Sequence, residues 1–340
     1  MAAPDTSLLT DIWYFAGLVS DFAKPARVVV AGEPILVGLK GGSPFALRDI
    51  CPHRAAPLSA GRLVEGDVEC PYHGWRFGTD GVCTRIPSLT SEQDLDPSRI
   101  RVRDYPARRT GQIVWVWLGQ GDPSYEPPDF PMAYRKPLLS DGLTLNCHVD
   151  HAVVGLMDPA HGPYVHAQWW WRSEHSMHEK SKAFEPRPMG FAMARHRPSS
   201  NSFAYRLLGG VPETEIVFQL PGIRTEHIQA GRREVLSFTA VTPETADRTR
   251  IRQVFFTDHP LAYALKPLVR AGARRFLRQD ASMVDLQQTG LRYDPRLMLI
   301  EDADVQAKWY YRLKKEWTAS RREQRDFLNP VTPRTLRWRS

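Results

Sequence analysis

Cysteine is scarce in this sequence, which has only four in 340 residues: Cys51, Cys70, Cys83 and Cys147. Cys51 and Cys70 each lie two or three residues before a histidine, so they are candidates for metal binding rather than for a disulfide. The other two, Cys83 and Cys147, are expected to be buried thiols. This usage of cysteine fits a reducing cytoplasm.

Long apolar runs are also missing. No stretch approaches the roughly 20 apolar residues that a membrane-spanning helix needs. The first ten residues contain no basic segment, and the apolar run 12–19 is too short for the core of a signal peptide. We therefore expect no membrane association, no export by a standard signal peptide, and a cytoplasmic location.

Nucleic-acid-binding motifs, internal repeats and low-complexity segments are absent as well, although the formal net charge is +7. Most arginines are spread along the chain, but Arg270, Arg274, Arg275 and Arg278 form a cluster. A solvated basic face, or a docking surface for an acidic protein partner, explains this charge better than a nucleic-acid partner does.

The most informative motif present is C-x-H followed by C-x2-H, formed by Cys51, His53, Cys70 and His73. A Rieske [2Fe–2S] cluster needs this donor set, with two cysteines on one iron and two histidines on the other. A structural zinc site is the main alternative. However, zinc fingers usually keep the cysteines together and the histidines together, whereas each arm here mixes them. We favour the Rieske cluster.

The chain is long enough for two domains. Residues 1–120 contain short apolar segments between turns, so we predict a small all-β domain that carries the cluster. The strongest predicted strand is the Trp-Val-Trp run between Gly111 and Gly119. The segment 121–131 is rich in proline and is predicted to be a joint between domains.

Residues 132–340 are predicted to form an α+β domain, with helices packed on an antiparallel sheet. Its predicted strands are Phe203–Leu208, Glu215–Leu220, Val235–Val241 and Ile251–Thr257. Its predicted helices are 150–161, 261–289 and 302–325.

A second metal site is indicated by D-x2-H-x4-H, formed by Asp158, His161 and His166. Two histidines are part of the 2-His-1-carboxylate triad of non-haem Fe(II) oxygenases. Five residues of a regular α-helix would turn the second histidine about 140° from the first. The helix must therefore be broken, and Gly162-Pro163 is placed to break it.

With both motifs, the chain resembles the Rieske non-haem iron oxygenases, specifically the oxygenase subunits of vanillate and dicamba O-demethylases. The resemblance implies a Rieske domain followed by a helix-grip catalytic domain, a homotrimer, and a mononuclear iron bound by His161 and His166. It also implies that Asp158 hydrogen-bonds to an iron-bound histidine and to the counterpart of His73 in the neighbouring subunit. One departure is Val154-Gly155, where many members have Asp-Asn.

The resemblance places the third iron ligand, a carboxylate, more than a hundred residues downstream. Asp280 is favoured because Phe276, Met283 and Val284 would share its helical face, and a buried carboxylate needs a partner. The neighbours of Asp285 are largely polar, which indicates surface. Other candidates are Glu301, Asp302 and Asp304, of which Asp304 can form an ion pair with Lys308.

The implied activity is that of a terminal monooxygenase that hydroxylates, or oxidatively O- or N-dealkylates, a small aromatic compound using O2. Electrons would come from NAD(P)H through a separate ferredoxin or flavin-dependent reductase, because the chain has no nucleotide-binding glycine fingerprint. Aromatic ring cis-dihydroxylation, a Rieske electron-transfer protein and a zinc-dependent binding module are the alternatives.

The substrate pocket is the least determined part. Leu156 and Val165 neighbour the metal-binding residues, and Thr239 matches a region that contacts substrate in relatives. Trp169-Trp170-Trp171 could line an aromatic pocket, although packing is the commoner role of such a run.

Overall fold

The computed structural model describes residues 7–167, 177–198 and 211–340. Two compact units are present: Thr10–Tyr134 forms one, and the other comprises Arg135–Ser340 with residues at the start of the chain. The proline-rich segment 121–131 lies within the first unit. Within it, Trp13 Nε1 donates to the carbonyl of Tyr125 at 2.8 Å and Thr110 Oγ1 donates to that of Pro128 at 3.1 Å.

The first unit consists of antiparallel sheets of short strands. One three-stranded sheet has the order β1-β11-β10: β1 Ile12–Leu18, β11 Ile113–Leu118 and β10 Ala107–Thr110. The predicted Trp-Val-Trp strand is β11, whose six residues are all buried. The strand is apolar throughout, rather than alternating, because β1 and β10 pair with its two edges and its side chains are covered on both faces.

Two four-stranded sheets complete this unit. The first has the order β2-β3-β4-β9: β2 Ala26–Val30, β3 Glu33–Lys40, β4 Ser43–Arg48 and β9 Asp104–Tyr105. The second has the order β5-β6-β7-β8: β5 Arg62–Val64, β6 Asp67–Glu69, β7 Arg76–Phe77 and β8 Cys83–Arg85. The loop with Cys51 and His53 connects β4 of the first of these sheets to β5 of the second, and the loop with Cys70 and His73 connects β6 to β7.

The second unit is built on an eight-stranded antiparallel sheet, as counted over the described residues. In spatial order its strands are β12 Leu139–Leu145, β18 Arg248–Thr257, β17 Arg233–Thr245, β16 Ile223–Ala230, β15 Pro212–Gln219, β14 Gly190–His196, β13 Glu179–Arg187 and β19 Arg334–Arg339. The predicted strands that fall on β15, β17 and β18 are confirmed. Phe203–Leu208 lies outside the described residues.

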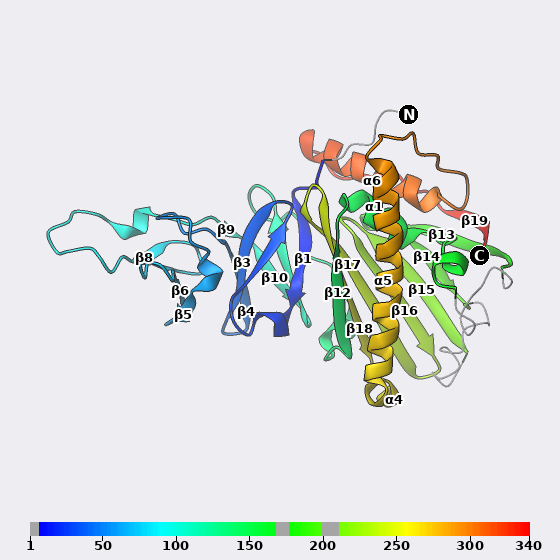
Figure 1. The fold of residues 1–340 in the computed structure, drawn as a ribbon, viewed down its shortest axis with the longest axis horizontal. Coiled ribbons are helices and arrows are strands. Elements are labelled where there is room, and N and C mark those ends of the chain that lie inside the picture. The colour runs from blue at the N-terminus through cyan, green and yellow to red at the C-terminus, as the bar shows by residue number, and fades with distance from the viewer. Residues whose placement is uncertain (1–6, 168–176, 199–210) are drawn as a thin grey trace. The chain divides into compact units, whose positions relative to one another are not determined.

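Helices cover this sheet, and Figure 1 shows α5 running across it. The helices are α1 Val149–Met157, α2 Gly162–Val165, α4 Pro260–Ala264, α5 Lys266–Leu291 and α6 Val305–Arg322. In α6, Trp309, Leu313 and Trp317 are buried at intervals of four residues, which gives one apolar face. The ring of Trp309 lies 5.6 Å from that of Phe184 and 5.1 Å from that of Phe191, so α6 packs on β13 and β14.

The predicted α+β arrangement, with an all-β unit followed by a sheet carrying helices, is confirmed. Predicted helix 261–289 corresponds to α4 and α5, and predicted helix 302–325 corresponds to α6. Predicted helix 150–161 was too long, because α1 ends at Met157. Among the described residues, none of the helices has the length and hydrophobicity of a membrane-spanning segment.

Candidate metal centres

The two Cys-His loops of the first unit share one hydrogen-bond pattern. Cys51 N donates to the carbonyl of Ala56 at 2.9 Å, and Cys70 N donates to that of Trp75 at 2.8 Å. Four residues after each cysteine, an amide donates back to the cysteine carbonyl: Ala55 at 2.8 Å and Gly74 at 3.1 Å. The two loops are therefore structurally equivalent, although their sequences are not.

This shared turn requires a left-handed residue in each loop. Gly74 has φ +70°, and Ala55 has φ 57° in the equivalent place. Glycine adopts this conformation without strain, whereas alanine does so at a cost of about 1–2 kcal/mol. The sequence gives no sign that Ala55 adopts the same conformation as Gly74.

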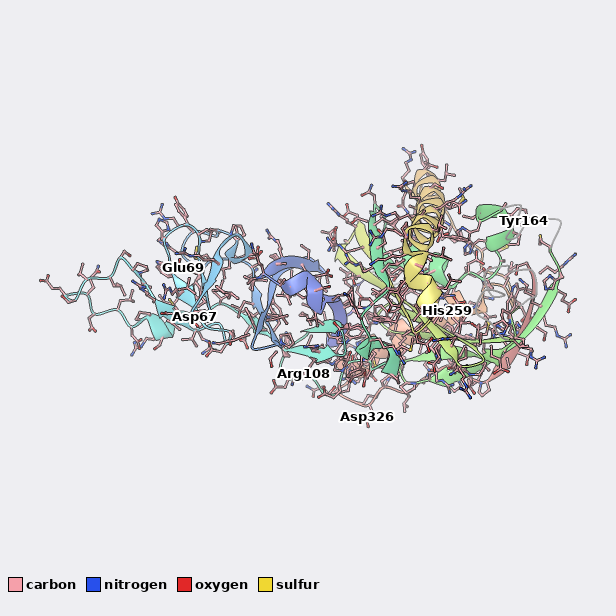
Figure 2. The ribbon with its side chains drawn as sticks, turned by 90° about the horizontal axis from the view of Figure 1, so that it is seen from below. Asp67, Glu69, Arg108, Tyr164, His259 and Asp326 are labelled. Carbon is pink, nitrogen blue, oxygen red and sulfur yellow. The ribbon has the colours of Figure 1, made fainter. Side chains whose placement is uncertain are left out.

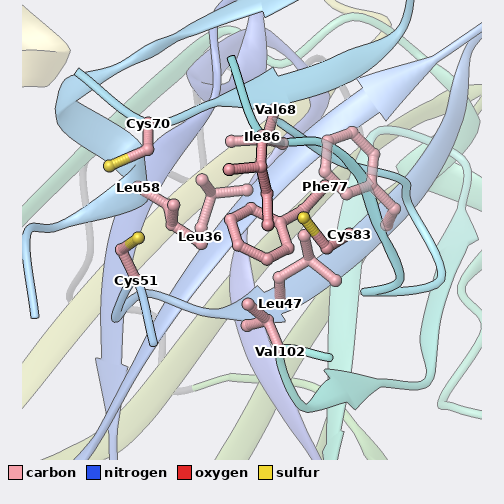
Figure 3. Packing of buried hydrophobic residues seen from close by; sticks show 11 residues of the cluster. Leu36, Leu47, Cys51, Leu58, Val68, Cys70, Phe77, Cys83, Ile86 and Val102 are labelled. Atoms are coloured by element: carbon pink, nitrogen blue, oxygen red, sulfur yellow. The ribbon is translucent and has the colours of Figure 1, made fainter. Parts of the chain in front are cut away.

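The cysteine donors and the histidine donors differ in burial. Cys51 and Cys70 lie at one end of the apolar core of this unit, which also contains Leu58, Phe77 and Cys83 (Figure 3). Burial, assisted by the neighbouring Cys70 thiol, raises the pKa of Cys51 to about 11. Metal binding must overcome this preference for the neutral thiol, since thiolate is the ligand form.

The histidines lie at the exposed tips of the loops. The rings of His53 and His73 have centroids 4.5 Å apart, and His53 stacks on Trp75 at 4.6 Å with an interplanar angle of 5°. Trp75 therefore fixes the orientation of one imidazole. An exposed imidazole edge is where electrons could enter or leave a bound cluster.

The spacing of the four donors tests zinc against a cluster. Ligands of one tetrahedral zinc lie within about 4 Å of one another. Among the described residues, the one group of donors that all lie within 4.8 Å is a different one, His161, His166 and Asp280. No three of Cys51, His53, Cys70 and His73 form such a group in the described part of the chain, and their buried thiols and exposed imidazoles fit a two-iron cluster with sulfur donors at one end and nitrogen donors at the other.

The second constellation is formed where α1 ends. Asp158 is the C-cap of α1, and its N–H donates to the carbonyls of Val154 and Gly155. His161 is then the N-cap of α2 and His166 its C-cap. The helix is broken before His161 rather than between the histidines, so Gly162-Pro163 begins a short helix instead of ending a long one.

This break brings the predicted ligands together. The Nε2 atoms of His161 and His166 lie 3.1 Å apart. Asp280 Oδ1, on α5, lies 3.0 Å from His166 Nε2 and 3.6 Å from His161 Nε2. Two imidazoles and a carboxylate that converge in this way match the donor set of a non-haem iron(II) site.

Asp158 holds His161 in a different way from the one expected. The nearest acceptor for His161 Nδ1 is the main-chain carbonyl of Asp158 at 2.9 Å, whereas the carboxylate Oδ2 lies at 3.7 Å. The carboxylate Oδ1 accepts from Ala160 N at 2.7 Å. Burial acts to raise the pKa of Asp158, but His161 and the Ala160 amide outweigh it and the net shift is downward.

Asp280 is less buried than its sequence neighbours suggested. Its side chain is 41% exposed, and Met283 is exposed as well, so proximity to the histidines rather than burial distinguishes this carboxylate. Asp285 is exposed, as expected. The expected ion pair of Lys308 is wrong, because Lys308 Nζ pairs with Glu301 at 2.6 Å and not with Asp304.

Two further residues at this centre were not found from the sequence. Gln279 Oε1 lies 3.1 Å from His166 Nδ1, and the Phe276 ring lies 4.6 Å from the His166 ring. Their spacing from Asp280 puts them on its helical face, but nothing in the sequence indicated that either residue contacts His166. Tyr164, which lies between the two histidines in the sequence, is 63% exposed. Figure 2 labels this residue.

The three predicted pocket residues are dispersed. Leu156 and Val165 are half-buried on α1 and α2, near the candidate ligands His161 and His166 in the sequence. Thr239 is buried in β17 and pairs across the sheet with Arg224, which in turn pairs with Phe218. Phe218 contacts Tyr310 of α6, so Thr239 faces the helix-covered side of the sheet. Trp169–Trp171 lies outside the described residues.

The predicted arginine cluster lies along one groove. A cavity of about 950 Å³ beside α4 and α5 is lined by Lys266, Arg270, Arg274, Arg275 and Arg278 and reaches Gln279. Arg274 forms an ion pair with Asp141.

Comparison with known proteins relates both units to one family. Residues 12–106 match the Rieske [2Fe-2S] domain, and residues 145–319, more than half of the chain, match the vanillate O-demethylase oxygenase C-terminal domain. The chain belongs to the Rieske oxygenases of the vanillate O-demethylase type. The predicted family and its two-part architecture are thus confirmed.

Individual relatives match this chain over part of its length. The chain is 34% identical over 163 residues to chlorophyllide a oxygenase of Chlamydomonas reinhardtii, covering 46% of this chain and 24% of that protein. It is 34% identical over 170 residues to the oxygenase component of dicamba O-demethylase of Stenotrophomonas maltophilia, covering 47% and 48%. The matches thus span less than half the length of either relative.

The fold matches over nearly the whole chain. A crystal structure of dicamba monooxygenase bound to dicamba has a TM-score of 0.73 and 21% identity, covering 95% of this chain and 99% of that one. Family membership of this Rieske oxygenase thus rests on the sequence matches, and the structural match establishes its fold.

Proposed function

We propose that this chain is the terminal oxygenase component of a multicomponent system. It would use O2 and electrons from a separate NAD(P)H-dependent reductase, directly or through a ferredoxin, to hydroxylate or oxidatively O- or N-demethylate a small aromatic compound. The observation that carries this proposal is the convergence of His161, His166 and Asp280 in a chain that also matches a Rieske domain.

The residues of each centre fit the group assigned to it. Cys51, Cys70, His53 and His73 would hold the cluster, and His161, His166 and Asp280 the mononuclear iron. When bound, the cluster would supply electrons one at a time and the iron would supply the site of dioxygen reduction. The separation of thiols inside and imidazoles outside supports the first assignment, and the 3.0–3.6 Å spacing to Asp280 supports the second.

The protein's own part is to orient these ligands. The Asp158 carbonyl accepts the Nδ1 proton of His161, which leaves the Nε2 lone pair directed at the metal position. The Asp158 carboxylate is 34% exposed, so it remains accessible to another group. We propose a homotrimer in which this carboxylate meets His73 of the neighbouring subunit, as the family resemblance implies.

The proposed demethylation is balanced in atoms and electrons, and it needs no cofactor beyond those named. A methoxyl group, O2, two electrons and two protons give a hydroxymethyl ether and water. The ether then loses formaldehyde and leaves a hydroxyl group. Dicamba O-demethylase is named for a reaction of this type, and the same class of reaction is proposed here. The free, buried Cys83 and Cys147 thiols support a location in a reducing compartment such as the cytoplasm.

Product mass spectrometry tests the proposal. The purified protein, NADH and a surrogate reductase would be incubated with methoxylated, N-methylated and unsubstituted aromatics. Loss of a methyl group with formaldehyde, or gain of one oxygen atom, is expected, and the Asp280→Ala variant should give neither. Gain of two oxygens and two hydrogens would show ring dihydroxylation instead. Cluster reduction with no product from any compound would favour an electron-transfer protein.

A further inference from the structure

One imidazole at the second centre is contacted by three residues of a single helix. Phe276, Gln279 and Asp280 lie at positions i, i+3 and i+4 of α5, so their side chains share one face. The Phe276 ring packs against the His166 ring at 4.6 Å, Gln279 Oε1 lies 3.1 Å from Nδ1, and Asp280 Oδ1 lies 3.0 Å from Nε2. Both ring nitrogens of His166 therefore face α5.

The chemistry of the two nitrogens differs. A neutral imidazole has one nitrogen that donates a proton and one that offers a lone pair. An amide oxygen only accepts, so Gln279 Oε1 requires the proton on Nδ1 of His166. The lone pair is then on Nε2, on the side of Asp280 and His161.

We propose that Gln279 is a positioning residue that fixes the tautomer and the ring orientation of His166 for metal binding. The proposal rests on the proposed iron site and adds to it a residue with no contact to the metal. His161 obtains the same control from the Asp158 main-chain carbonyl, which no substitution removes. The tautomer and orientation of His166 instead depend on the Gln279 side chain, so their origin can be tested by mutation.

A neutral acceptor suits the charge of the site. Asp280 lies beside both histidines, and the Asp158 carboxylate lies 3.7 Å from His161. A third carboxylate at position 279 would keep the hydrogen bond but add a negative charge. A thioether would fill a similar volume and offer only a weak acceptor. The variants Gln279→Glu and Gln279→Met thus distinguish the effect of losing the hydrogen-bond acceptor from the effect of changing the side-chain volume.

The test is the affinity of the mononuclear site for Co(II), measured independently of catalysis. The mononuclear metal would be removed by mild chelation from protein whose cluster remains intact by its visible absorption, and Co(II) would be titrated back. Gln279→Met should bind Co(II) about 10- to 100-fold more weakly than the parent. Gln279→Glu should stay within about threefold of the parent, because its carboxylate also accepts from Nδ1. Gln287→Met is the matched control, since Gln287 is exposed on the same helix, and should bind like the parent.

Equal Co(II) affinity in Gln279→Met and the parent would overturn the proposal. If Gln279→Met does not fold, Gln279→Asn replaces it, since its shorter amide cannot reach His166 Nδ1 and should cause the same loss. The Asp280→Ala variant separates this proposal from the proposed function. If Asp280→Ala binds Co(II) like the parent, the iron site itself is misplaced. If Asp280→Ala loses Co(II) while Gln279→Met keeps it, only the role of Gln279 fails.

Discussion

Asp158 contacts its surroundings through two separate groups, and this separation has a consequence for its mutants. The main-chain carbonyl accepts from His161 Nδ1 at 2.9 Å, whereas the carboxylate accepts from Ala160 N and lies 3.7 Å from His161. A change of the side chain leaves the closer contact in place. Metal binding and turnover should therefore respond differently.

In Asp158→Asn we expect both metal centres to be retained and turnover to fall by about 100-fold. The amide keeps the volume and the Ala160 contact but removes the negative charge proposed to face the neighbouring subunit. Iron content and the rate of product formation, measured on the same preparation, check this. Asp285→Asn, at an exposed position of α5, is the control. Normal turnover by Asp158→Asn would show that this carboxylate has no role between the centres.

A second residue-scale feature is a buried ion pair that joins α1 to α6. Lys314 Nζ lies 2.9 and 2.8 Å from the two carboxylate oxygens of Asp150, and Tyr310 OH donates to Asp150 Oδ1 at 2.6 Å. All three side chains are buried. Because α1 leads directly into Asp158 and His161, this pair fixes the helix that precedes the candidate ligands.

Lys314→Met should lower the free energy of unfolding by about 3–5 kcal/mol, because it leaves the Asp150 carboxylate buried without its cation. Denaturant unfolding measures this loss. Lys315→Met, at the exposed neighbouring position, should be close to neutral. The double variant Asp150→Asn/Lys314→Met should recover much of the lost stability. A Lys314→Met variant as stable as the parent would mean that the ion pair contributes nothing.

Residue identity predicted the candidate ligands better than it predicted their surroundings. Cysteine and histidine spacing indicated the first centre. The helical neighbours of Asp280 favoured it over Asp285, but the burial they implied is not present, because Asp280 is 41% exposed and lies beside the two histidines. The acceptors of His161 and His166 could not be predicted, because one is a main-chain carbonyl and the other comes from a helix about 113 residues away. Such contacts depend on tertiary structure and leave no local pattern.

At the scale of elements, the end of α1 decides the geometry of the second centre. The predicted helix extends to residue 161, but α1 ends at Met157 and a short helix begins at Gly162. A regular helix was excluded by the required angle between the histidines, and that argument was correct. The predicted position of the break, at Gly162-Pro163, was wrong, because proline is also favourable in the first turn of a helix and here lies in the first turn of α2.

Gly155 in α1 offers an element-scale test. A Cβ there would meet no atom within 4 Å in the described part of the chain, so steric crowding does not require glycine. Gly155→Ala should therefore stabilise the protein by up to about 1 kcal/mol, through the higher helix propensity of alanine. The control is Gly190→Ala, whose Cβ would lie 1.8 Å from the carbonyl oxygen of Phe218, and a loss of about 1–3 kcal/mol is expected. Thermal unfolding of the two variants compares them, and a destabilised Gly155→Ala would show that the position needs glycine.

At the scale of the whole molecule, the two units position their candidate ligands in different ways. The first unit buries the thiols of Cys51 and Cys70 and exposes the imidazoles of His53 and His73, while the second brings three donors from two separate segments to one point. Composition and strand patterns predicted the two units. The matches to the two family models confirm the predicted family. The net charge of +7 says nothing about the fold, but part of it is concentrated in the groove along α5.

We propose that one chain holds two iron centres with separate ligand sets. Iron, zinc and acid-labile sulfide should be measured per chain in the parent and in the Asp280→Ala and Cys70→Ser variants. About three irons and two sulfides are expected in the parent. Asp280→Ala should lose about one iron and keep all the sulfide, whereas Cys70→Ser should lose the sulfide with its irons. Zinc without sulfide in the parent, or full iron content in Asp280→Ala, would contradict it.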